Sequence, residues 1–105
     1  HEGPQSISKL NNVEIKEGMI LSNEPGYYKK NEFGIRIENL VYVKKINKKK
    51  VFENLTMVPI EKDLINYDLL TSVEKNYLFK YHLNVYSNIS AFLNNNEKKW
   101  LASFI

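Results

Sequence analysis

The sequence contains no cysteine, which excludes disulfide bonds and thiolate chemistry within these 105 residues. This absence favours a reducing compartment, and we expect the protein to be cytoplasmic. No apolar run is long enough to span a membrane and no secretory signal is visible, so we expect no membrane partner. These absences concern this segment and do not place a longer protein that contains it.

Arginine is almost missing as well, because Arg36 is the only arginine among fifteen basic residues. The formal net charge is +3, which raises the possibility of a nucleic-acid partner. Such a surface usually carries arginine side chains interleaved with aromatic ones, whereas the lysines here crowd residues 44–50. We interpret this lysine run as a solvated hairpin turn and expect no nucleic-acid binding.

The composition is that of a folded protein. Hydrophobic residues make up 43% of the chain and aromatic residues 12%, which argues against a disordered tail. The length corresponds to about one domain, small enough that its own core is marginal.

The first half of the chain predicts short strands. Residues 19–23 are apolar enough for a short buried strand, which delivers Glu24 to its end because Pro25 disfavours helix in the preceding residue. The other predicted segments are a polar connection at 28–32, a strand at 34–43, the lysine turn, and a returning strand at 51–60 that Pro59 ends or places at a sheet edge.

The predicted strand at 34–43 holds two charged residues. With a side-chain period of two, Arg36 and Glu38 share one face of this apolar strand. Buried charges are tolerated when they are paired or bound to a metal. The pattern alone therefore leaves two interpretations open, a buried Arg36–Glu38 ion pair or a metal ligand at Glu38.

The second half predicts two helices. Thr71 and Glu74 have the spacing of a capping box, and apolar residues then recur every three or four positions. We expect one amphipathic helix of about six turns with a core-facing stripe, followed by a short helix from about Glu97. The stripe comprises Val73, Tyr77, Leu78, Tyr81, Val85, Ile89, Phe92 and Leu93, and the short helix carries Trp100, Leu101 and Phe104 on one side.

Three motifs carry a resemblance to a known family: HEGP from His1, SNEPGYY from Ser22 and FGIRIEN from Phe33. They closely resemble the end of the catalytic domain of the aminopeptidase P (Xaa-Pro aminopeptidase) family, which are metallopeptidases with the pita-bread fold. The resemblance continues to Trp100 and covers nearly the whole chain. Because His1 lies inside the first motif, we expect these residues to be part of a longer protein.

The resemblance implies an α+β fold. Residues 1–60 would form the C-terminal part of the pita-bread catalytic domain, and residues 61–105 would form a helical C-terminal extension. The implied activity is release of the N-terminal residue from peptides with proline in the second position. The implied protein is a homodimer whose upstream sequence supplies two aspartates and a histidine to the same site.

Four residues acquire roles from this resemblance. Glu24 of the NEPGYY motif would bind metal and pass a proton to the leaving nitrogen, and Glu38 of IRIEN would bridge two divalent ions. Arg36 would orient these acidic groups. His1 of HEGP would lie in the substrate site, binding the peptide carbonyl or assisting proton transfer. An oxygen-rich site suits hard cations, and Mn²⁺ is the metal that the resemblance implies.

Plainer interpretations stay open for each residue. Glu24 could be a turn carboxylate, Glu38 the partner of Arg36, and His1 a structural histidine. A prolidase acting on Xaa-Pro dipeptides shares the fold and ligands, although the pattern from residue 51 to 100 argues against it. A metal-free relative that only binds peptides is a further alternative. His82 lies in the predicted long helix and is assigned no catalytic role.

Overall fold

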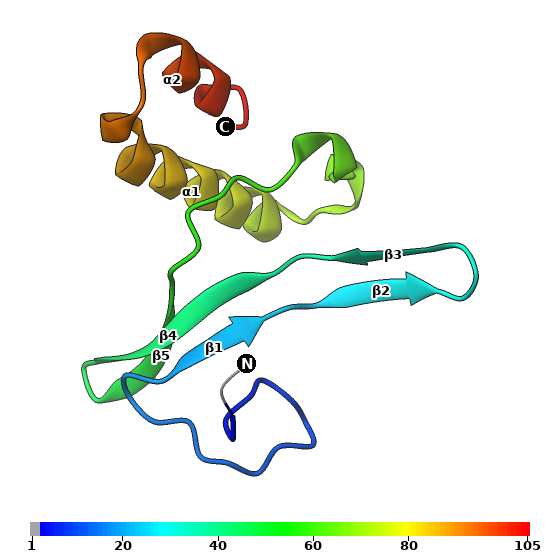
Figure 1. Ribbon diagram of the computed structural model, residues 1–105, viewed down its shortest axis with the longest axis vertical. Helices are drawn as coiled ribbons and strands as arrows, with labels where there is room; N and C mark the ends of the chain where they lie inside the picture. Colours follow the sequence, from blue (N-terminus) through cyan, green and yellow to red (C-terminus); the bar gives the residue numbers. More distant parts are fainter. Residues whose placement is uncertain (1–2) are drawn as a thin grey trace. The chain divides into compact units, whose positions relative to one another are not determined.

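The computed structural model describes residues 3–105, so the predicted substrate-site residue His1 lies outside the described part of the chain. The chain divides into two compact units, the first ending at Thr56 and the second beginning at Met57. The first unit contains strands and the second contains helices (Figure 1). The α+β fold is confirmed.

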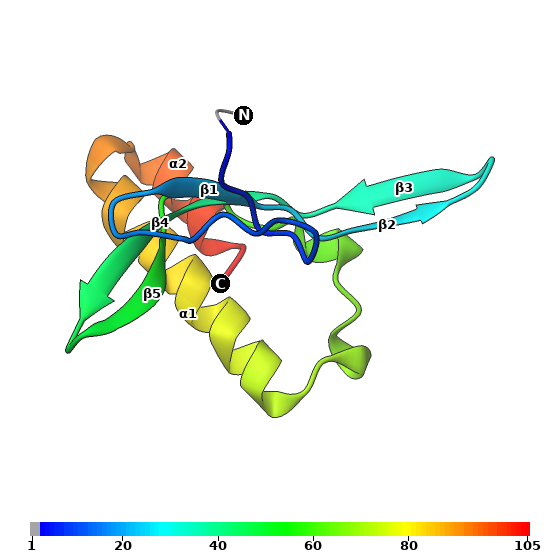
Figure 2. The same ribbon diagram turned by 90° about the horizontal axis from the view of Figure 1, so that it is seen from below.

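The first unit holds two antiparallel sheets within residues 3–56. One sheet has the strand order β1-β4-β5, with the small core of Leu21, Val41 and Val43 packed against Ile15 and Met19. The other is a hairpin of two strands (Figure 2). The strands are β1 (Ile20–Asn23), β2 (Gly26–Lys29), β3 (Phe33–Arg36), β4 (Asn39–Ile46) and β5 (Lys49–Asn54).

The prediction of one continuous strand at 34–43 is wrong. The strand stops at Arg36 and resumes at Asn39, so β3 and β4 belong to different sheets. Pro25 supplies the physical reason, because it has no amide hydrogen and cannot donate to a ladder. The facing chain breaks at the same level, where the Ile37 amide donates to the Pro25 carbonyl at 3.1 Å.

Two other strand predictions need correction. Residues 28–32 are not a plain polar connection, since they contain the end of β2 and a turn in which Asn31 has φ of 60°. The returning strand β5 ends at Asn54, so Pro59 neither ends a strand nor lies at a sheet edge. The buried character expected at 19–23 holds only for Leu21.

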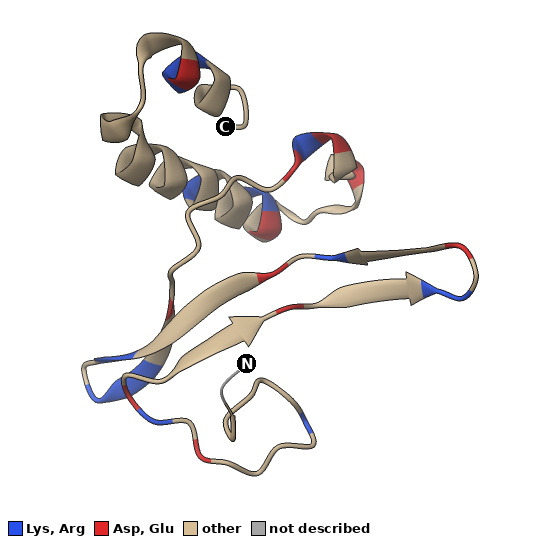
Figure 3. Ribbon diagram, in the orientation of Figure 1, with Lys and Arg blue, Asp and Glu red and all other residues tan. Residues whose placement is uncertain are grey.

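The lysine run forms the predicted hairpin turn. Asn47 and Lys48 have φ values of 47° and 65°, and a two-residue loop with positive φ at both positions is a type I′ turn. Residues 45–50 are exposed, and Figure 3 shows the basic segment at the tip of the β4–β5 hairpin.

The second unit is organised by two helices with matching caps. The Thr71–Glu74 capping box is confirmed, and Asn94 with Glu97 forms another that starts the short helix. The long helix has 18 residues, which is about five turns rather than six. The helical elements of the second unit are η1 (Lys62–Leu64), η2 (Tyr67–Leu69), α1 (Ser72–Ile89), η3 (Ser90–Phe92) and α2 (Asn95–Ala102).

The predicted core stripe of α1 is buried only in its middle. Tyr81 and Val85 pack with Leu101 of α2, whereas Val73 and Phe92 at the two ends are 78% and 84% exposed. The reason is length, because the short helix α2 covers a few turns of α1 and not the whole stripe. No described helix is long and apolar enough to cross a membrane.

One buried histidine joins α1 to the first residues of the second unit. His82 is 3% exposed, and its Nε2 accepts a hydrogen bond from the Ile60 amide at 3.0 Å. Beside it, the Tyr81 hydroxyl donates to the Val58 carbonyl at 2.6 Å. Both hydrogen bonds join α1 to residues 58–60.

Candidate metal centre

Glu24 lies in the break between β1 and β2, where Pro25 interrupts the strand. Its carboxylate is half-buried and accepts hydrogen bonds from the Ser22 hydroxyl at 3.1 Å and from the Arg36 guanidinium at 3.2 Å. These donors help to orient the carboxylate, as donors beside metal-binding carboxylates commonly do.

The alternative of an Arg36–Glu38 ion pair is not what the structure shows. Arg36 is the last residue of β3 and pairs with Glu24. The period-two argument fails because it assumed an unbroken strand, whereas Ile37 and Glu38 lie in the gap between β3 and β4. Glu38 is also exposed within this chain rather than buried.

The strand register brings the two glutamates opposite each other. Asn23 pairs with Asn39 at the end of one ladder, and Gly26 pairs with Arg36 at the start of the next. The register therefore continues without a shift through the two gaps, so Glu24 stands opposite Glu38. Figure 3 shows an acidic segment where β1 leads to β2 and another where β3 leads to β4, on neighbouring stretches of chain.

Glu38 lines a surface depression of about 700 Å³, here called the Glu38 depression. Its walls include Ser22, which also donates to Glu24, and residues Gly3 and Gln5 from the start of the described chain. The depression therefore brings together Gly3 and Gln5, strand β1 and the gap between β3 and β4, which are separated in sequence. Its remaining lining residues are Gly18, Met19, Ile20, Leu21 and Leu40.

The donor set suits part of a hard-cation site. Glu24 and Glu38 offer carboxylate oxygens, the ligands that Mg²⁺, Ca²⁺ and Mn²⁺ prefer. Among residues 3–105 no group of three or more histidine, cysteine, aspartate or glutamate side chains gathers to hold a metal. Two facing carboxylates alone bind a divalent ion weakly, so a complete site needs ligands from elsewhere.

Two features beside the site were missed by sequence reasoning. Ser22 donates to Glu24, and the ring of Tyr28 lies over two glycines of the β2–β3 hairpin. A Cβ atom on Gly34 would lie 2.6 Å from the Tyr28 ring, and one on Gly26 would lie 2.8 Å from it. The signal was present in the sequence, because a hairpin with a turn at 30–32 places Tyr28 opposite Gly34.

The mixed fold and the two glutamates opposite each other on paired strands agree with the pita-bread metallopeptidases that the sequence motifs resemble. The chain belongs to the M24 metallopeptidase family. Residues 1–45 match the model described as metallopeptidase family M24, and residues 50–103 match the model of the C-terminal region of peptidase M24.

Named relatives agree with this family. A probable Xaa-Pro aminopeptidase P of Coprinopsis cinerea is 42% identical over 96% of this chain and 18% of the relative. The Xaa-Pro aminopeptidase 1 of Dictyostelium discoideum is 41% identical over 100% of this chain and 19% of the relative. The chain thus spans less than a fifth of the length of these relatives.

A solved structure is similar over nearly the whole chain. The X-prolyl aminopeptidase of Caenorhabditis elegans superposes with a TM-score of 0.83 at 34% identity, covering 99% of this chain and 18% of that one. That protein is described as a cytosolic enzyme with a di-nuclear active site. The pita-bread prediction is confirmed by this likeness together with the family models.

Proposed function

We propose that this chain supplies two metal ligands, Glu24 and Glu38, to the dinuclear site of an Xaa-Pro aminopeptidase. The observation that carries the proposal is the unshifted register, which sets Glu24 opposite Glu38, the carboxylate that lines the Glu38 depression. The names of the relatives and of the solved structure support the same activity. The substrate would be a peptide with proline in the second position.

The two glutamates of this chain would have different roles at this site. Two divalent ions, for which Mn²⁺ suits the oxygen ligands, would polarise the scissile carbonyl and lower the pKa of a water molecule. Glu38 faces the open depression and would contact both ions. Glu24 would bind one ion, and its orientation by Arg36 and Ser22 would let it carry a proton to the leaving nitrogen.

The site would be completed by residues upstream of His1. We propose that two aspartates and a histidine from that part of the protein join the glutamates, because two carboxylates alone do not define a coordination geometry. His1 would act on the substrate carbonyl. Residues 1–60 would belong to the catalytic domain and residues 61–105 to a helical extension, in a cytoplasmic enzyme.

The helical extension would form part of a homodimer interface. Its supporting observation is apolar surface on the second unit, with Phe92 at 84% and Trp100 at 61% exposure. Deleting residues 96–105 from the intact protein should then shift its sedimentation toward the monomer. An unchanged sedimentation coefficient and melting temperature would contradict the interface.

Hydrolysis by the intact protein tests the activity. We expect cleavage of a tripeptide with proline second, no cleavage of the matched tripeptide with alanine second, and loss of turnover after dialysis against a chelator. Readdition of Mn²⁺ should restore turnover. Cleavage of an Xaa-Pro dipeptide in preference to the tripeptide would identify a prolidase, and peptide binding without turnover or metal would identify an inactive relative.

A further inference from the structure

The segment that forms one wall of the Glu38 depression has little packing to hold it. None of residues 3–14 is buried, and Leu10 near the middle of this loop is 93% exposed. The loop nevertheless turns back so that its start lies beside β1 (Figure 1), where Gly3 and Gln5 line the depression with Ser22 and Glu38. Hydrogen bonds must therefore set its course.

One side chain joins three points of this loop. The Asn11 amide nitrogen donates to the Pro4 carbonyl at 2.9 Å and to the Ser6 hydroxyl at 2.6 Å. The Asn11 amide oxygen accepts from the Val13 amide at 2.8 Å. A single primary amide can make all three contacts because it carries both donor and acceptor atoms.

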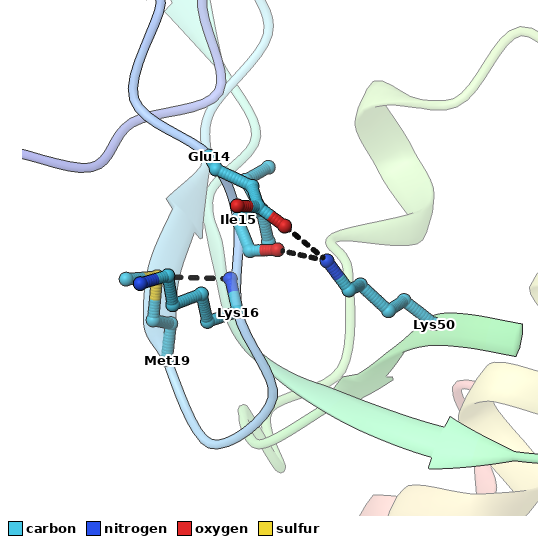
Figure 4. A network of polar contacts seen from close by, with 5 residues as sticks. All are labelled: Glu14, Ile15, Lys16, Met19 and Lys50. Atoms are coloured by element: carbon cyan, nitrogen blue, oxygen red, sulfur yellow. Dashed lines mark hydrogen bonds and ion pairs between the residues drawn. The ribbon is translucent and has the colours of Figure 1, made fainter. Parts of the chain in front are cut away.

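A lysine from the β4–β5 hairpin fastens the far end of the same loop. Lys50 Nζ donates to the Ile15 carbonyl at 2.7 Å and to the Glu14 carboxylate at 3.1 Å (Figure 4). The hydrogen bond and positive charge of Lys50 hold the pKa of Glu14 below its ordinary value. Because one acceptor is the backbone carbonyl of Ile15, this contact holds the main chain at the end of the loop, five residues before β1 begins.

We propose that Asn11 is a positioning residue of the active site. Through the Pro4 carbonyl it holds the N-terminal strip, residues 3–5, against the wall that contains Ser22 and Glu38, while Lys50 anchors the end of the loop. The strip contains Gly3 and Pro4, the described residues of the HEGP motif, and lines the depression that would receive the substrate. This inference rests on the proposed aminopeptidase activity.

Three variants of the intact protein test the role of Asn11. Asn11→Ala removes all three contacts, and Asn11→Asp removes the donor to Pro4 but keeps an acceptor for Val13. Asn12→Ala is the matched control, because no hydrogen bond joins the Asn12 side chain to the described residues. The readouts are kcat and KM for a tripeptide with proline second, metal content, melting temperature, and deuterium exchange of residues 3–13.

Both Asn11 variants should lose at least about tenfold in kcat/KM, since displacing a substrate-contacting group by about 1 Å can cost about 100-fold. Metal content and melting temperature should match Asn12→Ala, and exchange of residues 3–13 should accelerate only in the Asn11 variants. Kinetics equal to Asn12→Ala, or a loss of metal in parallel with activity, would overturn the positioning role. A wild type that cleaves no Xaa-Pro peptide would instead refute the proposed function, while unchanged exchange in Asn11→Ala would separately refute the loop contact.

Discussion

The two units of the chain differ in how much of their packing and hydrogen bonding each completes with its own residues. In the second, helix caps, a buried histidine and a core of Tyr81, Val85 and Leu101 all close within residues 57–105. In the first, the buried core is three residues, and the Glu38 side chain lines an open depression. The difference indicates that the second unit is the better packed of the two, whereas the first depends more on hydrogen bonds at its surface.

The largest expected effect comes from studying the 105 residues alone. We expect amide signals of residues 3–56 to be poorly dispersed and quick to exchange, because their small core does not offset the conformational entropy of ordering the strands. Helix α1 should keep slowly exchanging amides. Two-dimensional NMR with hydrogen exchange measures both, and equal protection of the two units would remove the contrast.

The next effect concerns the α1 stripe. Replacing Val85, which is fully buried, by alanine should cost about 1.5–3 kcal/mol, because two buried methyl groups at about 0.8 kcal/mol each are lost and a cavity is left. Val73→Ala removes the same atoms from an exposed position and should leave the second unit unchanged. Helix content followed by circular dichroism during denaturation compares them, and equal losses would mean that the stripe is covered along its whole length.

A smaller effect is expected in the β2–β3 hairpin. Gly34→Ala would place a methyl group 2.6 Å from the Tyr28 ring and should cost about 1–3 kcal/mol, as overpacking usually does. The ring is exposed, so its displacement relieves part of this cost. In a Tyr28→Ala background the same change should be nearly neutral. Denaturation midpoints of the four proteins give the coupling, and an additive result would exclude the ring contact.

The smallest effect is a pH dependence in the second unit. Burial is the largest cause lowering the pKa of His82 below its ordinary value, so the unfolded state binds a proton more readily. The free energy of unfolding is therefore unaffected by His82 above about pH 6.5, and it decreases as the pH falls below that value. Melting temperature against pH should show a decline in wild type that His82→Gln removes. An identical decline in that variant would assign it to other groups.

The helical half of the fold could be predicted because its signals are local. Thr71 and Glu74 are three residues apart, and the turn at Asn47 and Lys48 needs only its own backbone. The missing part was non-local: Pro25 breaks a strand whose partner then breaks at Ile37, twelve residues later. The motifs identified Glu24 and Glu38, but only the register shows that they face each other.

Metal content of two variants of the intact protein tests the central claim most directly. Glu38→Gln removes the carboxylate expected to bridge two ions held about 3.5–4 Å apart, so it should lose at least one ion. Glu24→Gln should retain more metal, and both variants should be nearly inactive toward an Xaa-Pro tripeptide. Elemental analysis after dialysis, beside turnover, gives the answer. If Glu38→Gln kept its full metal complement and near-normal turnover, the facing carboxylates would not be a metal centre.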